Sequence, residues 1–346
     1  MSSTATSSRQ SSKSSRTPDE SVLLLPQHAE LRELAQDSQV ELVDTHTHVL
    51  STFLAYRERY PDGKYDNIKD FVQATLPHMH SVVDVWCEAP MTAQWREVVD
   101  SLRELRSQDP KGLGYHFVVG AHPHEAKHYT DELEKLFLSA HSHPSCVGWG
   151  EMGLDYHYSK SPHDVQQDIL RRQLRTAIGT GLDKAITIHT READDDILRI
   201  LTEELPKETR IHIHCFTDSP ILAASLLAHF PNLFIGITGV VSFSSNVNTA
   251  QVIRDLGKDC SPEKPEGLRI VLETDAPFMV PTTLPTKELK MTSKQRFPFS
   301  IPAVLPYTAE YVARVLNEGK AEDARKWNTV DVLRQARENA RKLYTF

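Results

Sequence analysis

The chain lacks the features that mark several classes of protein. Its 346 residues include only four cysteines, which are widely spaced and form no CxxC pair, so neither a disulfide framework nor a thiolate zinc site is indicated. No apolar run approaches the roughly 20 residues that a membrane-spanning helix needs. We therefore expect a soluble protein of a reducing compartment, in the cytoplasm, the nucleus or both, that does not bind a membrane.

Basic residues are outnumbered by acidic ones. The chain has 39 Lys and Arg residues against 47 Asp and Glu residues, which gives a formal net charge of −8 at pH 7. This balance argues against a protein that coats nucleic acid with a broad basic face, although it leaves room for a local basic channel.

The N-terminal tail is poor in large apolar residues. Residues 1–17 are rich in serine and carry three basic residues and no acid, as mitochondrial targeting peptides do. They contain no Leu, Ile, Val, Phe, Trp or Tyr that could form the apolar face of a targeting helix. This composition is typical of a disordered tail, which we assign to residues 1–38 and through which a protein partner could bind.

From about residue 39 onward, strand-like segments alternate with helix-like ones. The expected strands cover 40–44, 81–87, 115–121, 146–152, 185–189, 210–216, 233–241 and 268–274. Helices are expected near 131–140, 162–179, 193–204, 219–229, 247–257, 303–317 and 330–344. Strands rich in Val and Ile that alternate with helices predict a buried parallel sheet. Eight such units in about 300 residues predict one α/β domain, a TIM (β/α)8 barrel, over residues 39–346.

Residues that can bind a metal stand at the ends of five of these apolar runs. They are His46, His48, Glu151, His189, His214 and Asp275. His46 and His48 share one face because side chains alternate along a strand. All six lie at or just beyond the C-terminal ends of strands, where TIM barrels place reactive residues. Mixed imidazoles and carboxylates suit a hydrolase with two divalent ions and accept Mg²⁺, Mn²⁺ or Zn²⁺.

Other histidines are expected to lie away from this cluster. His80 belongs to a second His-x-His, but this motif leads into a strand at the opposite end of the barrel. His141 and His143 precede a strand and are expected on the surface. His212 shares the inward face with His214 one layer deeper, which favours a core histidine with a hydrogen-bonded partner over a metal ligand.

Six segments of the chain, taken together and in order, resemble the TatD-like metal-dependent deoxyribonucleases. The family's motifs D-x-H-x-H, G-x-H-P-H, G-E-x-G-L-D-Y, I-H-x-R, H-C-F and E-T-D-x-P match residues 44–48, 120–124, 150–156, 188–191, 214–216 and 273–277. The resemblance covers roughly residues 40–346, and it includes a closing helix with Asn339.

Two features depart from the family's pattern. Asp218 follows Thr217 where the family commonly has glycine, which we expect to add a negative charge near the mouth of the barrel. The segment 278–302 is long and lacks the usual Arg-Asn-Glu-Pro pattern, which leaves the substrate contacts of this segment open.

The resemblance implies a TIM-barrel hydrolase that uses two divalent ions to cleave phosphodiester bonds in DNA, often as an exonuclease, with RNA as a further substrate to consider. By that analogy the six ligands divide between the ions, with one ion held by His46, His48 and Asp275, the other by His189 and His214, and Glu151 as the bridge between them.

Glu151 and Asp275 are the candidate catalytic residues. Asp275 could accept the proton of the attacking water as a general base, or it could serve as a metal ligand alone. Glu273 lies two residues before Asp275 on the same inward face. It either orients a metal ligand or forms a buried pair with a basic residue.

Four further residues are candidates for substrate contact. His122 and His124 follow the third strand and either bind phosphate or stabilise their loop. Arg191 could hydrogen-bond a phosphate oxygen or pair with a nearby acid. Tyr156 could stack on a base or pack in the core.

The segment 278–302 offers a second candidate surface for nucleic acid. It carries four cations and two phenylalanines, which are Lys287, Lys290, Lys294, Arg296, Phe297 and Phe299. Cations interleaved with aromatic rings suit single-stranded nucleic acid. A charged surface loop is the simpler interpretation.

Two other functions stay open. A His-x-His barrel with two metals also supports hydrolysis of a C–N bond in a small metabolite, as in amidohydrolases, although Glu151 stands where a carboxylated lysine would bridge the ions. A scaffold protein that has lost catalysis is the other alternative, suggested by the serine-rich tail and the altered 278–302 segment.

Overall fold

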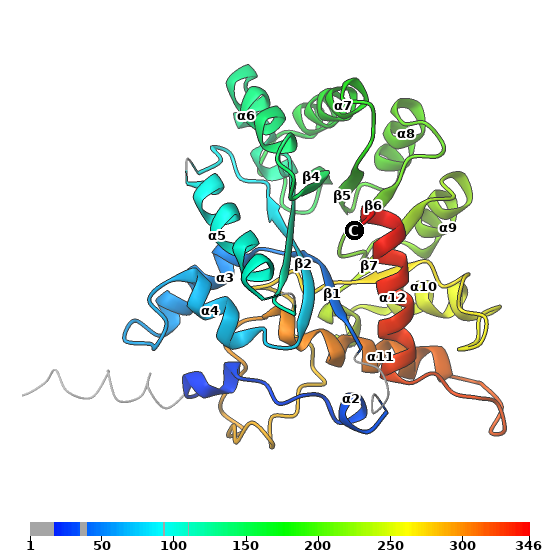
Figure 1. The fold of residues 1–346 in the computed structure, drawn as a ribbon. Coiled ribbons are helices and arrows are strands. Elements are labelled where there is room, and N and C mark those ends of the chain that lie inside the picture. Colours follow the sequence, from blue (N-terminus) through cyan, green and yellow to red (C-terminus); the bar gives the residue numbers. More distant parts are fainter. Residues whose placement is uncertain (1–16, 35–39, 93, 110) are drawn as a thin grey trace, which may run out of the picture.

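Eight parallel strands form the centre of the fold (Figure 1). The structure, a computed structural model, describes residues 17–34, 40–92, 94–109 and 111–346. The strands are β1 (Leu42–Thr47), β2 (Met79–Trp86), β3 (Gly114–Val119), β4 (Cys146–Asp155), β5 (Ala185–Arg191), β6 (Ile211–Ile213), β7 (Leu233–Ile237) and β8 (Ile270–Leu272). Each strand pairs with the next one in sequence. The segment after β8 bonds back to β1, from Asp275 N to His46 O at 2.9 Å, and the predicted TIM barrel is confirmed.

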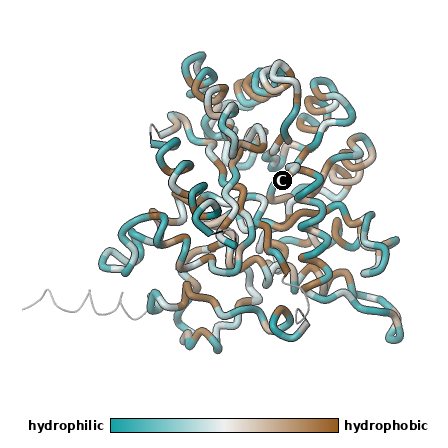
Figure 2. The backbone as a smooth tube through the Cα atoms, viewed as in Figure 1, coloured by the Kyte–Doolittle hydropathy of each residue, from teal (hydrophilic) through white to brown (hydrophobic). Residues whose placement is uncertain are grey.

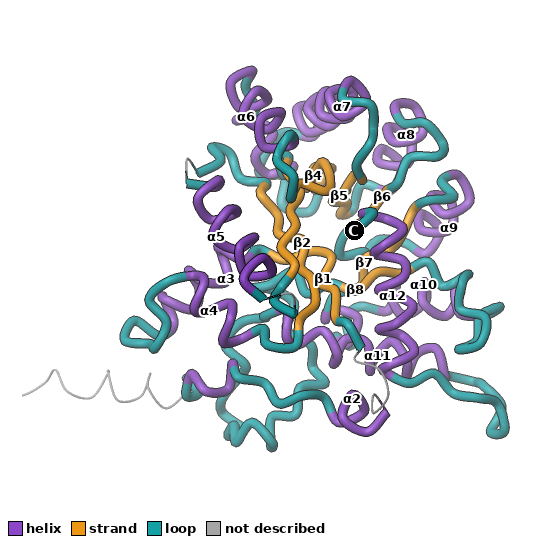
Figure 3. The backbone as a smooth tube through the Cα atoms, in the orientation of Figure 1, coloured by secondary structure: helices purple, strands orange, loops and turns teal. Residues whose placement is uncertain are grey.

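Helices surround the strands (Figure 3) because parallel neighbours must be joined by a crossover. They are α3 (Val49–Arg59), α4 (Ile68–Thr75), α5 (Trp95–Gln108), α6 (Asp131–His141), α7 (His163–Gly179), α8 (Asp194–Glu204), α9 (Pro220–His229), α10 (Val247–Gly257), α11 (Leu305–Asn317) and α12 (Thr329–Tyr344). Shorter segments are η1 (Glu20–Leu23), α2 (Ala29–Leu34), η2 (Pro123–His128), η3 (Gly239–Ser242) and η4 (Pro302–Val304). None of the described helices is long and apolar enough to cross a membrane.

The strands separate two apolar cores. Ile211 and Ile213 of β6 belong to the larger core, which also contains the buried faces of the helices. Side chains on the other face of the strands, such as Phe234 of β7, belong to a smaller core. This core also contains Leu343 and Tyr344 from the end of α12. In Figure 1 the C-terminus accordingly lies over the centre of the strands. Figure 2 shows hydrophobic residues along the strands and hydrophilic residues on the outer loops.

The expected disordered tail over 1–38 is wrong for residues 17–34, which pack against the barrel. Leu23 of η1 and Leu31 of α2 are buried, and the hydroxyl of Tyr56 donates to Glu20 Oε2 at 2.8 Å. The apolar residues that follow the serine-rich part supply this contact. Residues 1–16 and 35–38, with the protein partner expected for the tail, lie outside the described residues.

Candidate metal centre

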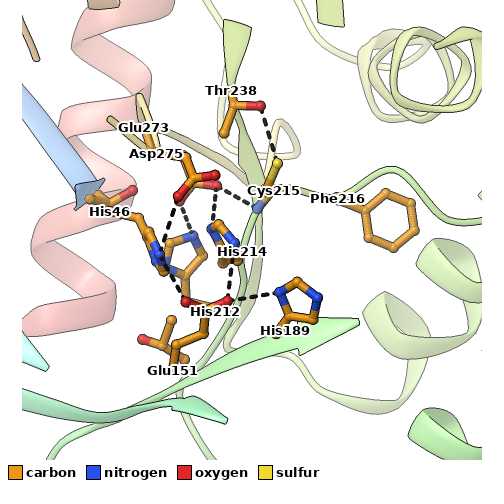
Figure 4. A network of polar contacts seen from close by, with 12 residues as sticks. His46, Glu151, His189, His212, His214, Cys215, Phe216, Thr238, Glu273 and Asp275 are labelled. Atoms are coloured by element: carbon orange, nitrogen blue, oxygen red, sulfur yellow. Dashed lines mark hydrogen bonds and ion pairs between the residues drawn. The ribbon is translucent and has the colours of Figure 1, made fainter. Parts of the chain in front are cut away.

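The six predicted ligands converge at one end of the barrel. His46 lies in β1, Glu151 in β4 and His189 in β5, while His214 directly follows β6 and Asp275 follows β8. Figure 4 shows these five side chains pointing toward one another. The sixth, His48, caps α3 after β1, and its Nε2 lies 3.4 Å from Asp275 Oδ1.

The carboxylate of Glu151 lies at the centre of this cluster. It is within 3.4 Å of one nitrogen of each of four histidines, which are His46 (3.4 Å), His122 (3.4 Å), His189 (2.8 Å) and His214 (3.3 Å). Gly150 makes this position possible. Its φ of +135° suits glycine, and a Cβ there would lie 2.3 Å from the carbonyl oxygen of Thr187.

Asp275 reaches the centre from an unusual backbone conformation. Its φ is 50°, in the left-handed region that non-glycine residues rarely adopt. The hydrogen bond from its N–H to His46 O holds it there. Such strain persists where the surrounding structure fixes it, often at functional sites. The Asp275 side chain is 10% exposed, so its carboxylate borders the open side of the cluster.

Two observations indicate that the cluster can bind metal ions. Both ring nitrogens of the buried His46, and Nδ1 of His214, form no hydrogen bond among the described residues, and the carboxylate oxygens beside His46 Nε2 and His214 Nδ1 are 3.4 Å away. Such atoms are costly to bury unless something binds them. Ligand atoms within 4.8 Å of one another also form groups of three, which include His46, His48 and Asp275, then His46, Glu151 and His214, and then His122, Glu151 and His189. These donors can hold a metal.

These groups match the expected division of ligands only in part. His46, His48 and Asp275 lie together as the resemblance implies. His189 and His214 both approach Glu151 Oε1, but the group that contains His189 contains His122 instead of His214. The structure therefore places His122, which we assigned to substrate contact, within the ligand cluster.

Glu151 and His46 favour the protonation states that bind a cation, whereas His48 favours the protonated form that a cation must displace. Burial alone would raise the pKa of Glu151, but the charges of His214 and His122 outweigh it and hold this pKa well below its usual range. Burial lowers the pKa of His46 to about 4. An ionised carboxylate and a neutral imidazole are the forms that bind metals. For His48, burial is outweighed by a hydrogen bond with Asp275, which raises the pKa to about 9.

Asp155 is a site residue that our sequence analysis missed. Its Oδ2 lies 2.8 Å from His124 Nε2 and 3.4 Å from His189 Nε2. Burial would raise its pKa, but hydrogen bonds with these two histidines hold it below its usual range. A carboxylate on the second nitrogen of a ligand histidine fixes the ring's orientation. The available signal was the Asp of the G-L-D-Y segment, four residues after Glu151.

Glu273 and His212 form a buried pair beneath the centre. Glu273 Oε2 lies 2.8 Å from His212 Nε2, and Oε1 lies 3.4 Å from Nδ1 of His214. The backbone N–H of Cys215 also donates to Oε1 at 2.5 Å. Both roles weighed for Glu273, pairing with a base and contacting a ligand, are therefore met by one carboxylate. His212 has the core partner we expected.

A cavity of about 490 Å³ opens above the cluster. His122, His124 and Arg191, which we predicted as substrate contacts, line it, and so do Tyr158 and Phe278. Tyr156 does not line it. Its ring stacks on His163 with 3.8 Å between ring centroids, and its hydroxyl donates to Asp196.

Of the two departures from the family's pattern, only the start of segment 278–302, with Phe278 and Met279, borders this cavity. Asp218 is buried, where it accepts hydrogen bonds from Thr190 Oγ1 and Glu192 N, so the expected charge at the mouth is instead a structural contact. The four cations of segment 278–302 do not line the cavity either. Gln295, which lies between Lys294 and Arg296, donates to Thr17 O. This contact favours the surface-loop interpretation.

His141 and His143 correct a further expectation, because both are buried. His141 stacks on Trp149 with 4.5 Å between ring centroids. Nε2 of His143 lies 3.0 Å from Asp100 Oδ1. Both rings have partners that a sequence pattern does not show.

Fold and site together define a class, the metal-dependent hydrolases built on a TIM barrel. Residues 43–345 match the family model for TatD related DNase, and the chain belongs to this family.

Three known proteins illustrate the likeness. The human 3′-5′ RNA nuclease TATDN2 is 30% identical over 278 residues, which cover 80% of this chain and 32% of that protein, so the chain spans about a third of this relative. The uncharacterized metal-dependent hydrolase YabD of Bacillus subtilis is 27% identical over 277 residues, covering 79% of this chain and 91% of YabD. An uncharacterized amidohydrolase from Saccharomyces cerevisiae superposes with a TM-score of 0.65 at 16% identity, covering 88% of this chain and all of that one. The last likeness shows the fold alone.

Proposed function

We propose that the protein is a nuclease that hydrolyses phosphodiester bonds in single-stranded DNA or RNA, working from the 3′ end. The observation that carries the proposal is the position of Glu151, whose carboxylate is ringed by four histidines at the base of a cavity of about 490 Å³. The family's name supports DNA as a substrate. The name of the human relative supports RNA and the 3′-5′ direction.

The ligand cluster is suited to two divalent ions. His46, His48 and Asp275 would hold one ion, His189 and His214 the other, and Glu151 would lie between them, with His122 close enough to join the second set. When bound, such a pair lowers the pKa of water and neutralises charge on the phosphate. Imidazole nitrogens outnumber carboxylates here, which favours Zn²⁺ or Mn²⁺ over Mg²⁺.

Asp275 is the proposed proton acceptor. Its carboxylate borders the cavity and lies 3.4 Å from His48 and 3.8 Å from His46. As water attacks phosphorus, its proton passes to this carboxylate and the bond from phosphorus to the leaving oxygen breaks. The leaving oxygen then takes a proton from solvent. Glu273 and Asp155 keep His214 and His189 oriented while this happens.

The family match favours phosphodiester hydrolysis over the C–N bond alternative. The assembled ligand cluster likewise favours a working enzyme over a scaffold protein, because a scaffold needs no convergence of four imidazoles on one buried carboxylate.

A cleavage assay tests the proposal. Purified protein is incubated with 5′-labelled single-stranded and duplex DNA and RNA, with Zn²⁺, Mn²⁺ or Mg²⁺ or with a chelator. Wild type should produce a ladder of shortened products from single strands, and a blocked 3′ end should stop it. Glu151→Gln should lower the rate about 100-fold or more, whereas Glu58→Gln, an exposed change on α3, should not. Equal cutting by wild type and Glu151→Gln would reject the proposed function.

A further inference from the structure

Phe278 presents an exposed aromatic ring at the mouth of the barrel. Its side chain is 57% exposed, whereas the other phenylalanines of the described residues are buried or partly buried. The ring lines the cavity and lies edge-on to His48, with 6.4 Å between ring centroids. An exposed ring adds little to folding, and its place beside the ligand cluster leaves its face open to a ligand in the cavity.

A tight turn fixes the backbone of Phe278 relative to the centre. The N–H of Phe278 donates to the carbonyl oxygen of Asp275 at 2.8 Å, and the N–H of Ser300 donates to Pro277 O at 2.9 Å. The Asp275 carboxylate and the Phe278 ring leave the same turn and line the same cavity. The backbone that carries the ring is therefore held next to the proposed proton acceptor.

Two cations border the cavity beside another exposed aromatic ring. Tyr158 is 56% exposed. Cζ of Arg191 lies 4.9 Å from its ring centroid, and Nζ of Lys160 lies 5.9 Å from it. Among the described residues, neither cation has a carboxylate within the 4.0 Å of an ion pair. Both charges are therefore available to an anionic ligand.

The barrel places these two groups on opposite sides of the ligand cluster. Tyr158 and Lys160 follow β4, and Arg191 ends β5, while Phe278 follows β8. In a ring of eight strands taken in sequence order, β4 and β8 are diametrically opposed. A chain of nucleotides that crosses the cavity meets the Phe278 ring on one side and the cations on the other.

We propose that Phe278 is a base-stacking platform and that Arg191 and Lys160 form a phosphate subsite for a neighbouring nucleotide of the same single strand. The assignment rests on the proposed nuclease function and narrows its substrate to strands with unpaired bases. Duplex bases are already stacked on one another, so a protein ring selects strands whose bases are free. Every base has a face that can stack, so the platform adds affinity with little sequence preference.

Strands that lack one base test the platform. Intact oligonucleotides, and copies with an abasic sugar at successive positions from the 3′ end, are titrated by fluorescence anisotropy in Ca²⁺. Wild type should bind the intact strand about 5- to 100-fold more tightly than the copy whose missing base faces Phe278. Phe278→Ala should bind both strands equally and weakly. Phe278→Tyr should restore the difference, and Leu54→Ala, an equally exposed apolar change on α3, should leave it unaltered.

Strands with one neutral linkage test the phosphate subsite. A methylphosphonate next to the scissile linkage should weaken wild-type binding about 10-fold. Arg191→Ala and Lys160→Ala should each bind the normal strand more weakly, and each should lose most of this penalty. Lys290→Ala, in the loop outside the cavity, should retain the full penalty.

Each outcome decides one claim. Equal binding of intact and abasic strands by wild type overturns the platform, and a linkage penalty that persists in both cation variants overturns the phosphate subsite. Cleavage is scored on the same strands. A wild-type protein that discriminates against the abasic strand but cuts nothing refutes the nuclease function while supporting the platform.

Discussion

Glu273 and His212 form a fully buried pair, with 2.8 Å between Oε2 and Nε2. The other oxygen of Glu273 contacts His214 of the metal centre. On its far side, His212 Nδ1 lies 2.8 Å from the hydroxyl of Tyr344, near the end of α12. A line of contacts therefore runs from the last helix of the barrel to a candidate metal ligand.

We predict that Tyr344→Phe weakens metal binding about 10-fold, because the change frees the ring of His212 and loosens Glu273 against His214. Metal affinity is measured by competition with a chelating dye, and the visible spectrum of the Co²⁺-loaded protein reports the ligand geometry. Tyr129→Phe is the matched control, since its hydroxyl donates to Glu134 far from the centre. Both variants should lose some stability, but an unchanged affinity in Tyr344→Phe would disprove the role of this line of contacts.

Asp155→Asn should lower metal affinity or cleavage rate about 10- to 100-fold, because the amide is a weaker partner for His189 and His124. Asp100→Asn removes a carboxylate from a comparable pair with His143, away from the cavity. Metal content by mass spectrometry and cleavage of a labelled strand are compared for the two variants. Similar losses in both would show that Asp155 matters for folding alone.

Gly150→Ala should destabilise the fold by more than about 3 kcal/mol, since a Cβ would collide with Thr187 O at a φ of +135°. Gly179→Ala is the control, because a Cβ there meets nothing within 4 Å at the end of α7. This second change should be neutral or stabilise by about 0.4–1 kcal/mol. Urea unfolding measures both, and a small loss in Gly150→Ala would contradict the close approach.

His141 should make stability depend on pH. Burial, with a smaller contribution from the charge of Lys184, lowers its pKa to about 4, whereas the unfolded value is about 6.5. Between these values the unfolded chain binds a proton that the folded chain does not. The free energy of unfolding is therefore highest above about pH 6.5 and falls as the pH drops toward about 4.

Urea unfolding at about pH 7 and about pH 4.5, with metal removed by a chelator, measures this effect. The free energy of unfolding of wild type should fall by about 2 kcal/mol more than that of His141→Gln. Parallel falls would show that other groups cause the pH dependence.

The barrel and the ligand cluster were predictable because both depend on local patterns. Apolar runs that end in a ligand residue indicate buried strands with their reactive ends together, and strand parity places His212 and His214 on one face. The E-T-D segment likewise places Glu273 inward, although its contact with both histidines emerges only when β6 and β8 are assembled.

Other features depend on geometry that the alternation of side chains along a strand does not determine. Beyond the end of β4 the chain turns, so Tyr156 packs on His163 while Tyr158 lines the cavity. The four-residue η1 helix is too short to carry a helical pattern, yet it buries Leu23. His141 is buried through its contact with Trp149, a tertiary contact without a sequence signature.

The junction between β8 and β1 has a consequence for folding. Asp44 Oδ1 accepts a hydrogen bond from Thr274 N at 3.0 Å across this junction, and one candidate ion site draws ligands from both of its sides. A cation held there would cross-link the first and last strands as a disulfide links distant cysteines, by reducing the freedom of the open chain. Removal of the cation by a chelator should therefore increase the hydrogen exchange of backbone amides first at the junction of β8 and β1, before the opposite strands open.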